Sequence, residues 1–276
     1  MTFKEEFLKA IGEILSGQRY YLVGNSFYIY RPEVEMVCEF SFDVIWGGRD
    51  FEILGGAATF CDDIGIVPEA HASEENRGRL NIWCPSVGDY ARAQGLANIQ
   101  NTNFDAMGSP KKYTKKELLP RLLENTALLK KTLLAELLRI ESIEDYYAFA
   151  LKRDSLFTGT KYFPQILFPT LDAFFLSVHV GKMQEAGAIY IVLLRQQSEA
   201  VYKINACMRL ELTKVLNERF AQLDYPNTMR GAAERWLAEA EIVGALLEEQ
   251  QELLMGEVSR RIERSRKVCN SFFKSF

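Results

Sequence analysis

The sequence predicts an α+β protein in which an N-terminal helix packs on an antiparallel sheet and a long-helix region, a helical hairpin or bundle, follows. Residues 34–46 alternate between apolar and other side chains, which is typical of a half-buried strand. From Thr114 onward, leucines recur at helical spacing instead. Charge changes as well: residues 1–110 carry 8 Lys and Arg against 16 Asp and Glu, whereas residues 111–276 carry 25 against 21. We therefore expect two regions, an α+β domain over 1–110 and a helical region over 111–276.

Composition places the chain among ordinary folded proteins. It has 276 residues, of which 48% are hydrophobic and 25% charged. No apolar run reaches the ~18 residues that a membrane span needs, so we expect no membrane contact. The five cysteines are dispersed and odd in number, which favours reduced thiols and a cytoplasmic location. Without a C-x-x-C pair and with two histidines, the chain offers no zinc motif, and we expect neither a structural metal nor a cofactor.

The first segments predict a helix and a hairpin. Residues 2–16 place apolar side chains at steps of three and four, behind the capping residue Thr2 and before the glycine at position 17. Residues 20–23 and 27–30 are rich in β-formers and flank Gly24-Asn25-Ser26. Such residues tolerate the positive φ angles of tight turns, so a β-hairpin is expected.

The alternation in residues 34–46 predicts a strand with its even positions in the core and most odd positions in solvent. Residues 51–60 form the returning strand, in which Gly55-Gly56 indicates a bulge or a close approach. Residues 80–84 are a further candidate strand. No helix fits between these strands, so the sheet is expected to be antiparallel.

The helical region follows a turn-rich boundary at residues 103–112. Thr114 and Glu117 have the spacing of a capping box at the start of a leucine-rich helix that continues to about Ile140. Pro120 lies inside this pattern and predicts a bend or a later start. We expect further helices over residues 142–151, 188–223 and 228–266, with an irregular connection over 154–169.

The N-terminal part resembles a family of uncharacterised bacterial domains of unknown function. The resemblance covers roughly residues 3–100 and is carried by the opening helix, the Gly24-Asn25-Ser26-Phe27 hairpin and the long alternating strand. It implies a bacterial protein with an α+β N-terminal fold. No catalytic residue is assigned to that family, so the resemblance implies no activity.

Acidic residues form the site-like cluster of this sequence. Carboxylates gathered on a sheet could bind Mg²⁺ or act as paired acid and base groups. Residues four apart on a strand are about 13 Å apart, too far to share one ion without neighbouring strands. The solvated face of an antiparallel sheet explains the same residues without any site. The candidate binding residues are Glu35, Glu39, Asp43, Glu52, Asp62 and Asp63, together with the loop residue His71.

Other motifs favour structural roles. The glycine pairs lack the frames of phosphate-binding loops. A basic cluster runs from Arg260 to Lys267, but positive charge is favoured at a helix C-terminus and the chain as a whole is acidic. We do not expect nucleic-acid binding.

The sequence thus favours a non-catalytic bacterial cytoplasmic protein that binds a protein partner or a second copy of itself. Long amphipathic helices and an acidic sheet face support this interpretation. The alternative is a metal-assisted hydrolase that uses the acidic residues of the N-terminal sheet. Convergence of those carboxylates in one pocket would separate the two hypotheses.

Overall fold

The computed structural model describes residues 3–45, 50–67, 78–96, 115–157 and 171–276. The chain forms two compact units: residues 1–59, 64–160 and 266–276 make the first, and residues 60–63 and 161–265 make the second. The predicted boundary at 103–112 lies outside the described residues, and the division into 1–110 and 111–276 stays a prediction. Among the described helices, none has the length and apolarity to cross a membrane.

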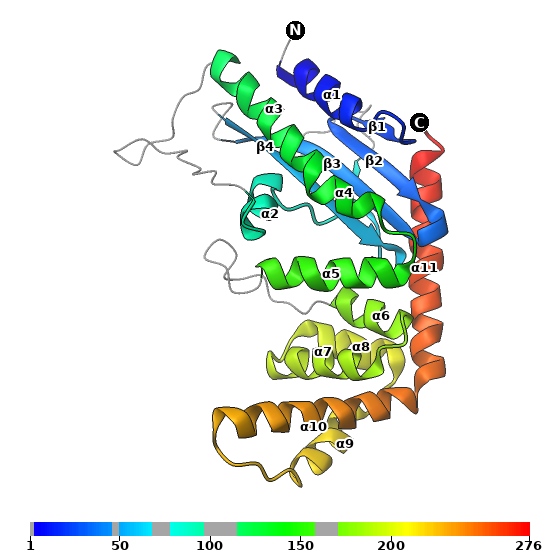
Figure 1. Cartoon of the computed structure of the whole chain (residues 1–276). Helices are drawn as coiled ribbons and strands as arrows, with labels where there is room; N and C mark the ends of the chain where they lie inside the picture. The colour runs from blue at the N-terminus through cyan, green and yellow to red at the C-terminus, as the bar shows by residue number, and fades with distance from the viewer. Residues whose placement is uncertain (1–2, 46–49, 68–77, 97–114, 158–170) are drawn as a thin grey trace. The chain divides into compact units, whose positions relative to one another are not determined.

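The first unit is built on a four-stranded antiparallel sheet (Figure 1). The predicted α+β class is therefore confirmed. The order is β1-β2-β3-β4, so each strand pairs with its neighbour in sequence. Its elements are α1 (Phe3–Ile14), β1 (Tyr21–Val23), β2 (Ser26–Arg31), β3 (Met36–Ile45) and β4 (Asp50–Thr59).

The predicted helix and hairpin are both present. In the hairpin, Val23 pairs with Ser26 across the two-residue loop Gly24-Asn25. Gly24 has a φ of 59°, a left-handed conformation that glycine adopts without steric cost. The turn residues from which the sequence predicts a hairpin therefore form the loop between β1 and β2.

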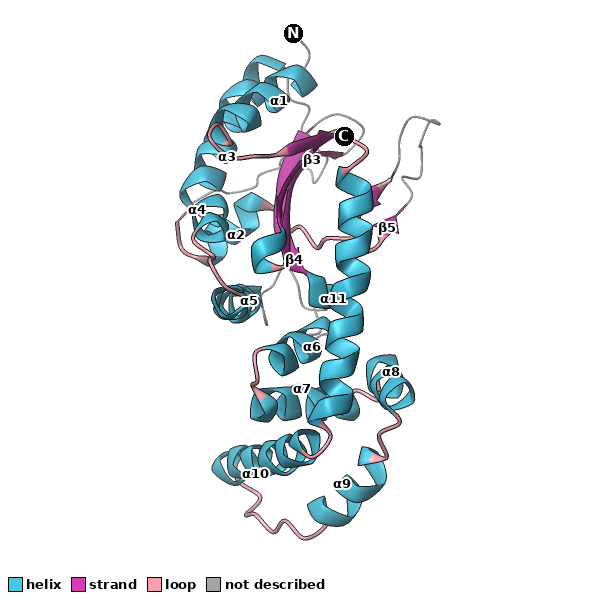
Figure 2. Cartoon of the chain, turned by 90° about the vertical axis from the view of Figure 1, so that its right-hand side faces the viewer, coloured by secondary structure: helices cyan, strands magenta, loops and turns pink. Residues whose placement is uncertain are grey.

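The prediction that most odd positions of β3 face solvent is wrong for its middle. Val37, Glu39 and Ser41 are all buried. Helices cover one face of the sheet, as Figure 2 shows for α1, and there the Phe7 ring lies 4.4 Å from that of Phe42. The last residues of α11 (Gln251–Phe273) cover the other face, where the ring of Phe272 meets that of Tyr28. A sheet covered on both faces buries both sets of alternating residues.

The strand predicted at residues 80–84 is largely wrong. A short pair forms instead, β5 (Ile66–Val67) with β6 (Arg79–Leu80), and α2 (Val87–Ala93) follows. The close approach predicted at Gly55-Gly56 is confirmed. A Cβ atom at Gly55 would lie 2.8 Å from the Leu133 side chain, and one at Gly56 would collide with the carbonyl of Trp83. These glycines let neighbouring segments approach both faces of β4.

The leucine-rich helix is two helices, α3 (Lys115–Lys131) and α4 (Leu133–Leu138), with a break at Thr132. Pro120 lies inside α3, and Thr114 of the predicted capping box lies outside the described residues. The helix expected over 142–151 is longer, since α5 spans Ile143–Phe157. These helices and α2 complete the first unit.

The second unit is a helical bundle. The helix predicted over 188–223 is wrong as one element, because left-handed residues Gln197 and Arg209 interrupt it. The helix predicted over 228–266 is divided at residues 249–250. The unit contains η2 (Phe60–Asp62), the first part of α11, and the helices α6 (Leu171–His179), α7 (Met183–Arg195), α8 (Glu199–Met208), α9 (Leu212–Phe220) and α10 (Met229–Glu248).

Two glycines let α7 and α10 pack closely in this bundle. A Cβ atom on Gly187 would lie 2.7 Å from both the Ala240 carbonyl oxygen and the Gly244 amide nitrogen. The buried core around this contact draws on every helix from α6 to α11 and includes Cys61 of η2. Residues 60–63 therefore contribute to the core of a unit whose other members come a hundred residues later.

Candidate functional site

Glu39 lies in the interior of the first unit, not on a solvated face. Its side chain is 2% exposed and accepts a hydrogen bond from the Ser26 hydroxyl at 2.8 Å. Tyr28 pairs with Glu39 across β2 and β3. Burial raises the pKa of the Tyr28 hydroxyl far above its usual range, and the nearby Glu39 carboxyl raises it further. The expectation of an exposed carboxylate row is therefore wrong at its central member.

Two other predicted carboxylates are held by arginines of α11. Glu35 precedes β3 with a φ of 53°, and its Oε1 accepts from Arg266 at 3.0 Å within the first unit. Asp63 pairs with Arg264 at 2.8 Å within the second unit. Both acidic residues thus have structural partners that are far away in sequence.

Asp43 and Glu52 are brought together, since they lie opposite each other in the β3–β4 register. Asp62 ends η2 in the second unit, and His71 lies outside the described residues. In the part of the chain that the structure describes, no three His, Cys, Asp or Glu side chains are grouped so that they could hold a metal ion. The carboxylates named for a hydrolase do not form one assembled set there.

The basic cluster of α11 is engaged in ion pairs. Arg260 pairs with Glu257 at 2.7 Å, and Arg261 pairs with Asp172. Arg264 and Arg266 bind the carboxylates described above. These pairings agree with the structural interpretation of this cluster.

The outer edge of β4 is closed by two segments of the first unit. Leu54 forms a β-bridge with Ser86, and the Gly55 amide donates to the Pro85 carbonyl at 3.1 Å. Further along the strand, the buried Tyr146 hydroxyl donates to the Ala57 carbonyl at 2.8 Å. At Gly55 and Ala57, main-chain groups that an edge strand would leave unpaired are therefore satisfied.

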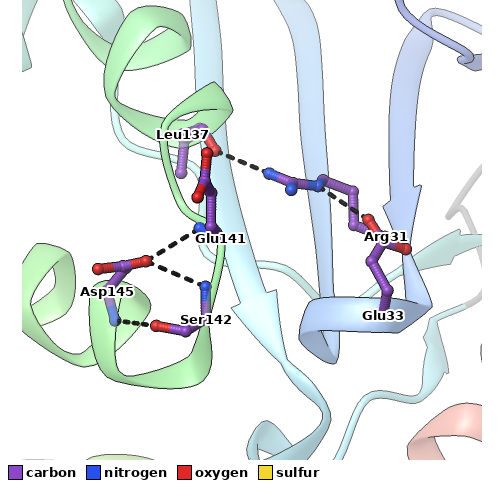
Figure 3. A network of polar contacts seen from close by, with 6 residues as sticks. All are labelled: Arg31, Glu33, Leu137, Glu141, Ser142 and Asp145. Carbon is purple, nitrogen blue, oxygen red and sulfur yellow. Dashed lines mark hydrogen bonds and ion pairs between the residues drawn. The ribbon is translucent and has the colours of Figure 1, made fainter.

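A polar network sets the start of α5, the helix that carries Tyr146, and Figure 3 shows its members Glu141, Ser142 and Asp145. Asp145 Oδ2 accepts from the amides of Glu141 and Ser142 at 3.0 Å, while the Asp145 amide donates to the Ser142 hydroxyl. This reciprocal arrangement is a capping box with Asp in the third helical position. These hydrogen bonds lower the pKa of the Asp145 carboxyl below its usual value.

A separate set of contacts ties α4 to the sheet. Arg31 at the end of β2 donates to the Leu137 carbonyl of α4 at 3.4 Å and pairs with Glu33 at 3.2 Å (Figure 3). The Leu137 carbonyl lies in the last turn of α4 and also accepts from the Ile140 amide at 3.4 Å, so Arg31 is an additional donor to it. The junction between α4 and α5 is thereby tied to β2.

The opposite end of the sheet is different. We call residues Tyr20–Val23 the β1 edge. Tyr20 is 39% exposed and Leu22 is 44% exposed. No other strand among the described residues pairs with β1 besides β2. The β1 edge is thus an apolar surface at the unbridged side of the sheet.

The register shows which main-chain groups the β1 edge presents. A two-residue loop places a hydrogen-bonded pair next to it, here Val23 with Ser26. Antiparallel pairs alternate, so Leu22 and Phe27 form a non-hydrogen-bonded pair and the Leu22 amide and carbonyl are directed away from β2. No charged residue occurs from Tyr20 to Tyr30. Charge, which commonly protects an edge strand, is therefore absent from β1 itself and from the residues of β2 that pair with it.

Aromatic rings continue the apolar surface around the β1 edge. The centroid of the Tyr21 ring lies 4.7 Å from that of Phe273. The Arg19 guanidinium also lies over the Tyr21 ring, 5.7 Å from its centroid. Phe272 links Phe273 to the exposed Phe276, with ring centroids 5.1 and 5.5 Å apart. Phe272 and Phe273 are themselves buried, so the rings form a packed aromatic cluster from Tyr21 that ends at the exposed Phe276.

Sequence reasoning identified these residues as a hairpin but not as a candidate site. The sequence does contain a signal for such a site, namely the run of uncharged β-forming residues at the first strand. Strand order was needed to show that this run lies at the side that stays unbridged. Comparisons with family models, curated proteins and solved structures found no match, so the resemblance to uncharacterised bacterial domains stays a prediction.

Proposed function

We propose that this chain is a non-catalytic protein-interaction or self-association module and that strand addition at the β1 edge is its binding mode. The observation that carries the proposal is the contrast between the two sides of the sheet. Pro85, Ser86 and Tyr146 engage the β4 side, whereas the β1 side presents Leu22 main-chain groups and exposed apolar side chains.

The size of β1 sets the character of the interaction. The strand has three residues, so an added strand gains few main-chain hydrogen bonds, each with a net worth of about 1 kcal/mol. Side-chain burial on Tyr20, Leu22 and Phe276 has to contribute the rest, at roughly 25 cal/mol per Å² of apolar surface. A small contact of this kind is typical of transient complexes.

Sedimentation velocity over a concentration series tests self-association. Leu22→Lys places a charge on the edge, which is how natural sheets prevent edge pairing. Leu123→Lys is the matched control, because Leu123 is 56% exposed on α3 in the same unit. We expect Leu22→Lys to reduce self-association while Leu123→Lys associates as the wild type does. Slower amide exchange at Leu22 in the associated sample would identify strand addition.

The same pair of variants tests a different partner. As immobilised baits, wild type and Leu123→Lys should retain a partner that Leu22→Lys loses. If all three chains retain the same proteins, the β1 edge is not the binding surface. A wild-type chain that stays monomeric and retains no protein would contradict the module itself.

A further inference from the structure

Arg261 is the most deeply buried cation of the second unit's α11 segment and contacts three other groups of that unit. Its side chain is 6% exposed. The Nε atom donates to the Cys61 carbonyl at 2.6 Å, and Nη2 donates to Asp172 Oδ1 at 2.5 Å. The guanidinium also lies 4.3 Å from the centroid of the Phe175 ring. One side chain thus joins η2, α6 and α11.

The segment that Arg261 holds is an excursion of the chain. Residues 60–63 belong to the second unit, although residue 59 before them and residue 64 after them belong to the first. Cys61 is fully buried in the helical core. Asp63 closes the segment in a left-handed conformation, with a φ of 47°, that costs energy for a residue other than glycine. Its carboxylate pairs with Arg264 of α11.

The electrostatics make Arg261 the critical member of this contact. Burial raises the pKa of the Asp172 carboxyl, Arg261 opposes that shift, and the Asp63 carboxyl adds to it. Two acidic groups near each other are therefore tolerated because arginines lie beside them. Asp172 is 43% exposed, so solvent can hydrate its carboxylate if Arg261 is lost, whereas the buried Cys61 carbonyl would lose its guanidinium donor.

We propose that residues 60–63 form a strap that closes on the helical unit and that Arg261 is the latch that holds it shut. With the strap closed, the Cys61 thiol is shielded in the core. When Arg261 releases the Cys61 carbonyl, residues 60–63 lose the hydrogen bond that holds them on α11. The Cys61 thiol then becomes accessible to solvent. The strap is a conformational device that is independent of binding at the β1 edge.

Thiol alkylation of the folded full-length chain, read by mass spectrometry at each cysteine, tests the latch. Arg261→Met removes the guanidinium but keeps an unbranched apolar stem of similar reach. Arg260→Met is the matched control, because Arg260 is the preceding residue on the same helix and is largely exposed. The alkylation rate of the exposed Cys207 gives the reactivity of an accessible thiol with the reagent. Protection of the buried Cys269 shows that the first unit stays folded.

We expect Arg261→Met to raise the alkylation rate of Cys61 by at least about tenfold, since the buried Cys61 carbonyl loses its guanidinium donor. Arg260→Met should match the wild type, and Cys269 should stay protected in every variant. An unchanged Cys61 rate in Arg261→Met would overturn the latch. So would a simultaneous rise at Cys61 and Cys269, because that result is general unfolding.

Arg261→Lys keeps the test decisive if Arg261→Met does not fold. Lysine retains the charge but lacks the planar fork that reaches the Cys61 carbonyl and Asp172 together. We expect a Cys61 rate above that of the wild type. A rate equal to the wild type would show that charge alone suffices and would contradict a latch built on the guanidinium.

Discussion

The Tyr146 hydroxyl of α5 donates a hydrogen bond to the main-chain carbonyl of Ala57 on β4, across 89 positions of sequence and 2.8 Å of space. Both residues are buried. Through this bond a helix completes the hydrogen bonding of a sheet edge, so the β4 side cannot take another strand at that position. The β1 edge has no such partner among the described residues.

Tyr146→Phe should therefore destabilise the first unit. The variant keeps the ring and its packing near Phe149 but leaves the buried Ala57 carbonyl without this donor, at a cost of about 1–3 kcal/mol. Urea denaturation measures the loss. Tyr202→Phe, at an exposed tyrosine, is the control and should be neutral. Equal stability of the two variants would contradict a structural role for the hydroxyl.

Gly187→Ala should destabilise the helical bundle. The added methyl group would lie 2.7 Å from main-chain atoms of α10, so the two helices have to separate. Overpacking of this kind costs about 1–3 kcal/mol. Gly256→Ala is the matched control, because a Cβ at this helical position of α11 meets no atom within 4 Å. It should stabilise the chain by about 0.5–1 kcal/mol, and denaturation midpoints that shift in the same direction would refute the close-packing argument.

The Asp145 capping box should make stability depend on acid pH. Hydrogen bonds from the Glu141 amide and from Ser142 lower the pKa of Asp145 in the folded state. A lowered carboxyl pKa stabilises the folded chain above the unfolded value, about 3.9, and this stabilisation is lost as pH falls through the folded value. Unfolding free energies of wild type and Asp145→Ala should therefore differ near pH 7 and converge as pH falls through the lowered folded-state pKa. A difference that stays constant with pH would argue against the charged cap.

The buried cysteines should be chemically inert in the native chain. Burial raises the pKa of the Cys38 thiol to about 12, so almost no thiolate is present at pH 8. Cys207 is exposed. Iodoacetamide at pH 8 should modify Cys207 long before Cys38, and denaturant should remove the difference. Comparable rates in the native chain would mean that β3 opens readily.

Local patterns predicted the elements that depend on neighbouring residues. The hairpin at Gly24-Asn25 formed as expected because its turn chemistry is contained in the turn itself. Helix breaks at Gln197 and Arg209 escaped prediction, since both residues adopt left-handed conformations without a glycine or proline to indicate them. Their conformations are set by the packing of the flanking helices and not by intrinsic preference.

The candidate site was less predictable than the fold. Alternation in β3 predicted a wet face with Glu39 on it, and alternation cannot reveal that the C-terminal part of α11 covers that face. The partners of Glu35 and Asp63 lie more than 200 positions away. Pairings at such separation have no local signal in a single sequence.

By itself, the sequence determined the α+β class, the antiparallel hairpins and the helical character of the later region, because periodicity and turn residues act over a few positions. Tertiary structure alone decided that both faces of β3 are covered, which edge of the sheet Tyr146 closes, and which unit holds residues 60–63. These outcomes depend on burial and hydrogen bonding between distant segments, and those segments meet only when the chain is folded.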